Sequence, residues 1–235
     1  MTDYNLYRGS IFHCIEDGGN VKPVYFPDGL MVVSEGKIVE VGEYSELSVR
    51  FRSGDPIVHF KDSLIMPGFI DSHIHYPQYK VISSYGTSLL QWLNKYTFVE
   101  EQKFSDIDYA SRIAELFLDE LIRNGTTTAM TFCTSHKQSV DVFCSAAEKR
   151  NLRMIAGKVM MDRNAPEELC DDVESSYADS KSLIEKWHNK GRLSYAVTPR
   201  FAPTSTEGQL IQAAKLLKEY PNTKSAKGVL LQTHL

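Results

Sequence analysis

The sequence predicts an α/β protein in which the first five strands of a (β/α)8 barrel of the TIM type follow a small N-terminal β-segment. Two observations predict this fold. Up to about residue 66, short apolar runs alternate with turn residues, as in a β-domain. After Pro67-Gly68, strand-like and helix-like patterns alternate along the chain. This order is typical of a parallel sheet covered by helices.

The N-terminal segment contains a hairpin signal in the stretch "LMVVSEGKIVEVG". Two apolar runs flank Glu35-Gly36, and a turn of this kind joins antiparallel strands. The runs "IVHF" and "SLIMPG" follow, and Pro67-Gly68 interrupts the pattern because both residues favour turns. We therefore place a domain boundary near residue 66, with residues 1–66 as a β-unit and residues 67–235 as the barrel segment.

The barrel segment contains five strand-like runs separated by helical patterns. The runs are "GFIDSHI" (68–74), "TTTAMTF" (126–132), "RMIAGKVM" (153–160), "LSYAVT" (193–198) and "GVLLQT" (228–233). The first helix begins at Ser105, with Asp108 as its capping-box partner, and follows the 3.6-residue period until Gly125 ends it. Further helices are predicted over 137–150, over 174–189 with a stop near Gly191, and over 205–219.

A complete barrel of this type has eight strands, and the chain shows five. We expect three further strands beyond Leu235, because the fifth strand would otherwise remain an unpaired edge that soluble proteins normally cover. A chain limited to these 235 residues is therefore expected to aggregate.

The composition favours a cytoplasmic globular protein. Of 235 residues, 42% are hydrophobic and 24% are charged, and the net charge is -4. The chain has no Lys/Arg run for a nucleic-acid backbone, no apolar stretch of about 18 residues for a membrane span and no signal-peptide pattern at its start. Its cysteines lack CxxC spacing and are expected to be buried thiols in a reducing compartment. They are Cys14, Cys133, Cys144 and Cys170.

Two histidines stand out in the stretch "PGFIDSHIHYPQ" (67–78). His73 and His75 lie two residues apart, so they share one strand face, and Pro77 ends the strand just beyond them. This position is the mouth of a barrel, where catalytic groups lie. His234 also follows a strand, so the three histidines are predicted to bind a metal such as Zn²⁺. The alternative is that they are structural, and Asp71 is predicted to orient a neighbouring histidine.

The motif "PGFIDSHIHYPQ" resembles the first-strand motif of the amidohydrolase superfamily. Several further stretches are similar to the guanine deaminases in particular, and they occur in the expected order across nearly the whole chain. They are "HYPQ" (75–78), "LLQWLNKYTF" (89–98), "GKVMMD" (157–162), "TPRF" (198–201) and "QTHL" (232–235). The resemblance implies a metal-bearing barrel and a β-sandwich built from both chain ends, of which residues 1–66 would be the N-terminal part.

The same resemblance implies hydrolytic deamination of guanine to xanthine and ammonia, a step of purine catabolism and salvage. It implies one Zn²⁺ per site, with Fe²⁺ as the alternative metal, bound by His73, His75 and His234, and a homodimer when full length. Zinc lowers the pKa of water toward about 7. His234 would also be a catalytic residue, whereas the Glu and Asp that transfer protons in this family would lie beyond the chain end. We therefore expect the 235-residue chain alone to be inactive.

The resemblance also implies which residues contact the substrate. Arg200 would pair with the O6 and N7 acceptors of guanine, Gln78 would bond the remaining polar edge, and Phe201 would stack on the ring. Trp92, in the loop after the first strand, would form part of a lid, and His75 and His234 would also face the substrate. The alternatives are a surface ion pair for Arg200, a loop cap for Gln78, and core packing for both aromatic residues.

The remaining polar residues are interpreted as structural or solvated. They are His13, His59, His136, His188, Glu100-Glu101 and Asp171-Asp172. Two other functions stay open: another aminohydrolase of the superfamily, acting on cytosine, an adenosine-type substrate or a triazine, and an inactive purine-binding or assembly module. A two-metal hydantoinase or dihydroorotase is disfavoured because "TPRF" offers no lysine after the fourth strand. The cytidine-deaminase fold is excluded because H-x-E and P-C-x-x-C do not occur.

Overall fold

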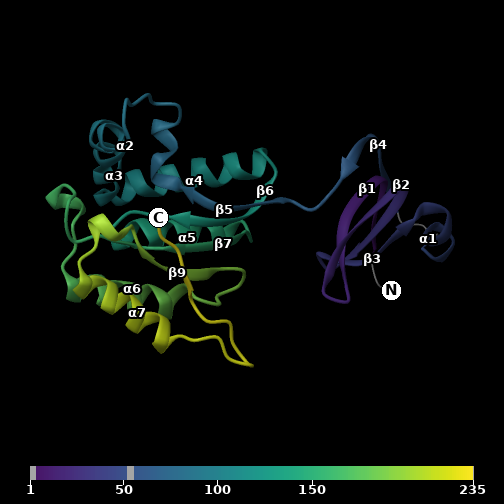
Figure 1. Ribbon diagram of the computed structural model, residues 1–235. Helices are drawn as coiled ribbons and strands as arrows, with labels where there is room; N and C mark the ends of the chain where they lie inside the picture. Colours follow the sequence, from purple (N-terminus) through teal and green to yellow (C-terminus); the bar gives the residue numbers. More distant parts are fainter. Residues whose placement is uncertain (1–3, 52–55, 235) are drawn as a thin grey trace. The chain divides into compact units, whose positions relative to one another are not determined.

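The computed structural model describes residues 4–51 and 56–234. The chain divides into two compact units, Met1–Pro67 and Gly68–Leu235 (Figure 1). Each unit has its own sheet. Within the described ranges, no helix is both long and apolar enough to cross a membrane.

The N-terminal unit is a four-stranded sheet with the strand order β3-β2-β1-β4. Its strands are β1 (Asn5–Asp17), β2 (Asn20–Ser34), β3 (Lys37–Glu43) and β4 (Ile57–Ile65). The predicted hairpin is confirmed, because β2 and β3 are antiparallel and Ser34 pairs with Lys37. Glu35 and Gly36 between them both have positive φ, as the tight turns of hairpins require.

The prediction that this unit is entirely β was wrong in one place. Helix α1 (Tyr44–Arg50) follows β3 directly. Its buried Leu47 packs with Leu6, Leu30 and Val32 from the sheet. A seven-residue helix depends on such packing rather than on its own propensity, so the local sequence pattern did not reveal it.

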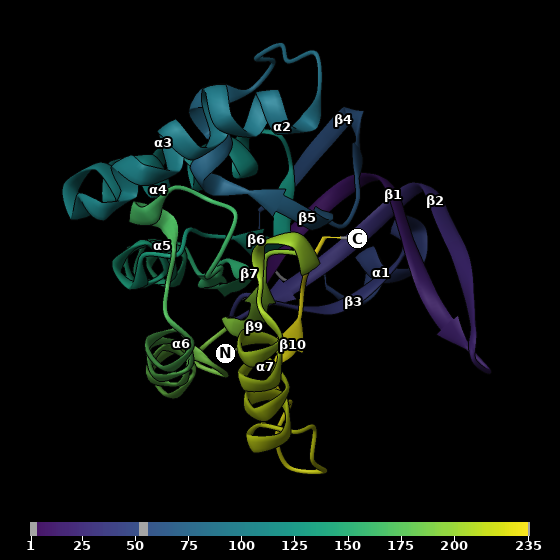
Figure 2. The same cartoon turned by 60° about the vertical axis from the view of Figure 1, so that its left-hand side comes forward.

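The second unit contains a curled parallel sheet with the strand order β10-β9-β7-β6-β5 and a short strand, β8, paired with β9. Every strand pair in it is parallel. The strands are β5 (Phe69–His75), β6 (Thr126–Phe132), β7 (Arg153–Gly157), β8 (Val159–Met160), β9 (Ser194–Pro199) and β10 (Leu230–Leu231). Figure 2 shows the curl of this sheet and the helices along its outer side. The prediction of an α/β protein with a parallel sheet is confirmed.

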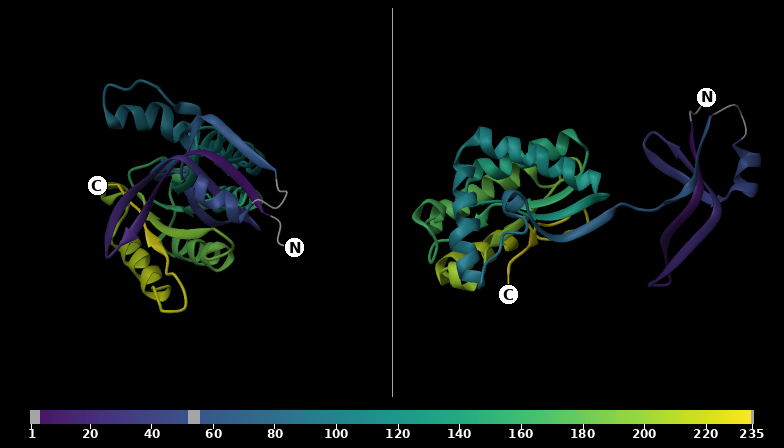
Figure 3. Two further views of the ribbon diagram at one scale, coloured as in Figure 1. Left: turned by 90° about the vertical axis from the view of Figure 1, so that its right-hand side faces the viewer. Right: turned by 90° about the horizontal axis from the view of Figure 1, so that it is seen from above.

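Four longer helices connect these strands and cover the sheet (Figure 3). They are α4 (Ile107–Arg123), α5 (Lys137–Lys149), α6 (Val173–Trp187) and α7 (Glu207–Glu219). Gly125, with φ of 80°, follows α4 as predicted. The predicted cap was wrong, because Asp106 rather than Ser105 caps α4 and accepts hydrogen bonds from the backbone N–H groups of Asp108 and Tyr109.

Three other predicted boundaries shift. The third predicted strand divides at Lys158, whose backbone N–H donates to the hydroxyl of Tyr195 instead of continuing a ladder. Helix α6 ends at Trp187, because the ring of His188 turns away and bonds the backbone of Tyr195 and Lys227. The fifth predicted strand keeps only Leu230–Leu231 in ladder geometry.

The segment after β5 is helical rather than a loop. It contains α2 (Leu89–Trp92), the π-helical turn η2 (Leu93–Thr97) and α3 (Phe98–Gln102). Ser88 caps α2 by accepting a hydrogen bond from the backbone N–H of Gln91, which is a strong local signal for a helix start. This segment lies beside the C-terminal ends of the strands, next to the site described below (Figure 1).

The main core of the second unit lies between the sheet and the covering helices. Tyr76, directly after β5, is fully buried and donates a hydrogen bond from its hydroxyl to the carbonyl of Ser139. Cys133 and Cys144 are buried as predicted, Cys170 is partly buried, and Cys14 is exposed. The exposed Cys14 contradicts the expectation that all four thiols are buried.

Candidate metal centre

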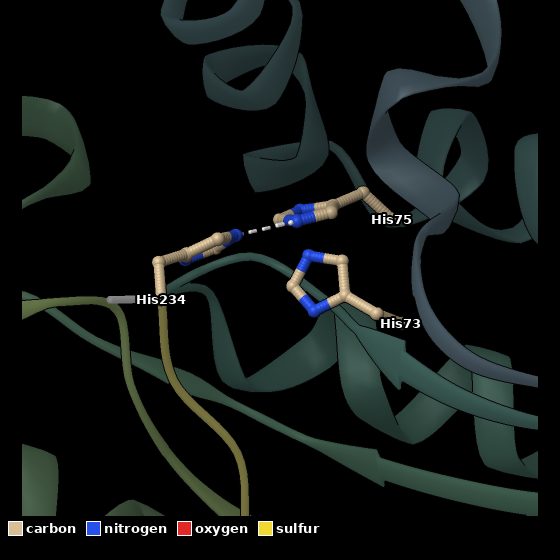
Figure 4. Close-up of side chains that lie close together, drawn as sticks. All are labelled: His73, His75 and His234. Carbon is tan, nitrogen blue, oxygen red and sulfur yellow. Dashed lines mark hydrogen bonds between the residues drawn. The ribbon is translucent and has the colours of Figure 1, made fainter.

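Three histidines from the two edge strands of the curled sheet point toward one another (Figure 4). His73 and His75 are on β5, and His234 lies three residues beyond the end of β10. One ring nitrogen of each lies within 4.8 Å of those of the other two. The Nε2 atoms of His75 and His234 are 3.0 Å apart. The structure therefore brings together the three residues that the sequence singled out as metal ligands.

Local structure explains where each ring points. Strand alternation puts His73 and His75 on one face, and a 3₁₀ helix, η1 (Tyr76–Val81), follows at once with Pro77 in its first turn. The carboxylate of Asp71 accepts a hydrogen bond from the backbone N–H of His73 at 3.0 Å. Asp71 thus contacts the backbone of the histidine rather than its ring, which corrects the detail of its predicted orienting role.

His234 is held by the backbone of Arg200. The carbonyl of Arg200 lies 2.9 Å from the backbone nitrogen of His234 and 2.8 Å from its Nδ1. Since a carbonyl only accepts, Nδ1 carries the proton, and Nε2 presents its lone pair to the other histidines. A metal-ligating histidine is normally oriented by such a bond.

Phe132 packs against all three rings and was missed by the sequence analysis. It is the last residue of β6 and pairs in register with His75. The centroid of its ring lies 5.0, 4.5 and 4.6 Å from those of His73, His75 and His234. Its fully buried side chain therefore forms an apolar support for the cluster. The available signal was its place at the end of the strand next to β5.

The surroundings of His75 and His234 favour their neutral imidazole forms. Burial, followed by the charges of Arg200, His234 and His73, holds the pKa of His75 well below its ordinary value. Burial also lowers the pKa of His234, although its bond to the Arg200 carbonyl opposes the shift. A neutral ring nitrogen is the form that binds a metal.

The donor set fits a zinc-type ion. Bonds of about 2.0–2.1 Å in a tetrahedral arrangement place ligand nitrogens roughly 3.3 Å apart, close to the 3.0 Å between the Nε2 atoms of His75 and His234. Imidazole nitrogens suit zinc and iron more than calcium or magnesium. Among the described residues, these three histidines form the single such group of potential ligands.

A cavity of about 410 Å³ opens beside the histidines. It is lined by residues from the strand ends and from the helical segment after β5, and it includes every residue predicted to contact the substrate. The lining residues are His73, His75, Gln78, Leu89, Trp92, Leu93, Arg200, Phe201 and His234. Trp92 lines this cavity and also packs against a small core cluster of the same unit.

The interpretation of Glu100-Glu101 as solvated charges was wrong. Glu101 is 1% exposed and Arg200 is 3% exposed. Two hydrogen bonds join them, from Nη1 of Arg200 at 2.6 Å and from Nη2 at 3.1 Å. Arg200 is therefore not in a surface ion pair. No local pattern indicates this pair, because the two residues are 99 positions apart.

Two other polar residues were predicted to be solvated or structural, namely Asp171 and His136. Asp171 is not simply solvated, because the buried Lys158 donates a hydrogen bond to its carboxylate at 2.5 Å. His136 lies just before α5, where its Nδ1 is 3.1 Å from the hydroxyl of Thr134. It does not line the cavity.

A curled parallel sheet with a histidine cluster at the carboxyl ends of its strands is consistent with part of a (β/α) barrel that carries a metal-type site. Residues 64–234 match the Amidohydrolase family, and the chain belongs to that family.

Relatives and solved structures agree with this assignment. Guanine deaminase from Escherichia coli (strain K12) is 50% identical over 199 residues, which are 85% of this chain and 45% of the relative. The crystal structure of guanine deaminase from Bradyrhizobium japonicum has a TM-score of 0.90 and 39% identity, over 99% of this chain and 50% of that one. The crystal structure of guanine deaminase from C. acetobutylicum, with bound guanine in the active site, has a TM-score of 0.87 and 31% identity. The match covers 99% of this chain and 53% of that one. The chain spans about half the length of these proteins.

Proposed function

We propose that the intact protein containing this chain is a metal-dependent guanine deaminase, which converts guanine and water to xanthine and ammonia. The observation that carries the proposal is the cavity in which three metal-type histidines meet Arg200 and Gln78. The similarity to guanine deaminases, one of them described with bound guanine in its active site, supports the same substrate.

His73, His75 and His234 would hold one zinc-type ion, with Fe²⁺ as the alternative. When bound, such an ion supplies Lewis acidity that makes water nucleophilic at neutral pH. The Arg200 carbonyl keeps the proton of His234 on Nδ1, and Phe132 excludes water from one side of the three rings. These contacts hold the ligand nitrogens near their binding positions.

The other lining residues would bind and orient the purine. The guanidinium of Arg200 would donate to O6 and N7, which are acceptors in guanine. The amide of Gln78 would meet the remaining polar edge, and Phe201 and Trp92 would cover the ring. His75 and His234 would face C2, from which the amino group leaves. None of the described residues that line the cavity carries a carboxylate.

The wider organisation follows the same proposal. Residues 1–66 would be the N-terminal part of a composite β-sandwich, and residues 67–235 the first part of the barrel. The protein would act in the cytoplasm as a homodimer.

The test is ammonia release by the intact protein, with guanine, adenine, cytosine and a triazine compared at equal concentration. Guanine should be the preferred substrate and xanthine the product. Removing the metal with a chelator should abolish turnover, and added Zn²⁺ should restore it. Preference for another ring would identify another aminohydrolase. Purine binding with no turnover in the presence of zinc would contradict an enzymatic role.

A further inference from the structure

Glu101 lies behind the cavity rather than in its lining, yet it forms a buried ion pair with Arg200, which does line the cavity. Resting on the proposed function, we propose that Glu101 is a positioning residue, which fixes the guanidinium of Arg200 in the orientation that recognises the purine edge. Glu101 itself would not touch the substrate.

The geometry of the pair fixes the guanidinium plane. Both oxygens of Glu101 accept hydrogen bonds, one from each terminal nitrogen of Arg200, and such paired bonds add directional specificity. The ring of Phe98 lies 5.3 Å from Cζ of the same group. Of the five N–H donors of an arginine, two are used, so the others remain available to acceptors in the cavity.

The pair also balances the positive charge of Arg200 close to the metal-type site. The charge of Arg200 lies close to the histidine cluster, because Arg200 lines the same cavity as the three histidines and its carbonyl contacts the ring of His234. An uncompensated guanidinium there would repel a divalent cation. The carboxylate of Glu101 makes the pair neutral overall, so that a strong donor for the substrate can lie beside a metal site.

Arg200 links this pair to a metal ligand through its backbone. Its side chain bonds Glu101 of α3, and its carbonyl accepts both hydrogen bonds from His234. A shift of α3 would therefore move the guanidinium relative to the histidines. Breaking a buried ion pair of this kind also destabilises the fold. Stability and substrate recognition are therefore measured separately below.

The adjacent Glu100 is a matched control. It lies on the same helix and is 5% exposed, but its carboxylate is bonded by Lys103 and Tyr109, which do not line the cavity. A substitution of Glu100 thus disturbs a buried carboxylate of α3 without touching Arg200.

The experiment compares Glu101→Asp with Glu100→Asp in the intact zinc-loaded protein. Aspartate keeps the charge but is one methylene shorter, so in the first variant the guanidinium must shift. Because a misplacement of about 1 Å can cost 10²-fold, we expect kcat/KM for guanine to fall by about 10²-fold, mainly through KM. Zinc content and thermal unfolding should match those of Glu100→Asp, whose kcat/KM should stay within about twofold of the parent.

A double-mutant cycle with Glu101→Gln and Arg200→Gln tests whether Glu101 acts through Arg200. We expect Glu101→Gln to weaken guanine turnover strongly in the parent and by less than about twofold in the Arg200→Gln background. Equal losses in both backgrounds, or Glu101→Asp with parental kcat/KM, would overturn the inference. If Glu101→Gln does not fold, Glu101→Asp alone decides. A parent that is inert toward guanine would instead refute the proposed function.

Discussion

Replacing Phe132 with alanine should weaken metal binding as well as stability. The side chain is fully buried and contacts the rings of all three histidines at centroid distances of 4.5 to 5.0 Å. Truncating a buried phenylalanine costs about 3–5 kcal/mol. At about 2–4 °C per kcal/mol for a domain of this size, the melting temperature should fall by roughly 6–20 °C.

The effect on the metal has a separate cause. Without the phenyl ring, the three imidazoles lose the surface that holds them together, and loss of groups that orient ligands typically costs 10–100-fold in metal affinity. Competition with a chromogenic chelator measures this affinity at a temperature where the variant is folded. We expect Zn²⁺ to bind about 10–100-fold more weakly.

Phe143→Ala is the control for this prediction. Phe143 is equally buried and stacks on Tyr76 with centroids 5.0 Å apart. It contacts none of the three histidines in the ring contacts of the described residues. It should cost similar stability and leave the zinc affinity unchanged. If both variants bound zinc with equal affinity, the support that we assign to Phe132 would be refuted.

Four further predictions concern the site and its surroundings. Replacing both His73 and His75 with alanine should abolish stoichiometric zinc, as measured by elemental analysis, and full metal content in that variant would contradict the ligand assignment. Arg200→Ala should reduce the preference for guanine over adenine, which a polar mismatch can set at about 10⁴-fold; an unchanged ratio of kcat/KM values would refute its recognition role. Burial, and then the charge of a nearby lysine, lowers the pKa of His136 in the folded protein. As pH falls below about 6.5, His136 therefore binds a proton in the unfolded chain at a higher pH than in the folded protein. Stability should therefore drop below that pH at up to about 1.4 kcal/mol per unit, and urea unfolding of His136→Gln should show a smaller drop; identical pH slopes would contradict this. Gly157→Ala should cost about 1–3 kcal/mol or more in urea unfolding, because its Cβ would lie 1.7 Å from a backbone oxygen of β9. A loss below about 1 kcal/mol would show that β7 and β9 can separate without cost.

The strands and longer helices were predictable because their patterns are local. The hairpin at Glu35-Gly36 and the helix that stops before Gly125 follow from residues next to one another in sequence. Helix α1 was missed because such a short helix gains its stability from tertiary packing. The helical segment that begins at Leu89 was missed although Ser88 supplies a local cap signal. The cap was misassigned because Ser105 and Asp106 are both good capping residues, and the sequence pattern alone does not rank them.

The metal-type histidines were predictable for a similar reason, whereas their supports were not. Strand alternation and the following Pro77 locate His73 and His75 at a strand end without any tertiary information. The burial of Glu101 depends on Arg200, which is 99 residues away. A pair of acidic residues on a short helix is normally solvated, and only the fold shows that one of them is paired inside.

The curl of the sheet brings its two edge strands close together, and the histidines at their ends therefore form one site. Strands β5 and β10 lie at opposite ends of the strand order, with β6, β7 and β9 between them. In a flat sheet, four spacings of about 4.8 Å would separate the edge strands by roughly 19 Å. The ring nitrogens of their histidines nevertheless lie within 4.8 Å of one another.

Residues that set this curvature should therefore control the site without touching it. Gly157 ends β7 where the backbone of β9 approaches closely, and Gly is the residue that permits such an approach. A side chain there would push β7 from β9 and move His234 away from His73 and His75. Zinc affinity should consequently fall in Gly157→Ala even when enough native protein remains to measure it. A destabilised but folded Gly157→Ala protein with parental zinc affinity would show instead that the histidine cluster is set locally at the strand ends.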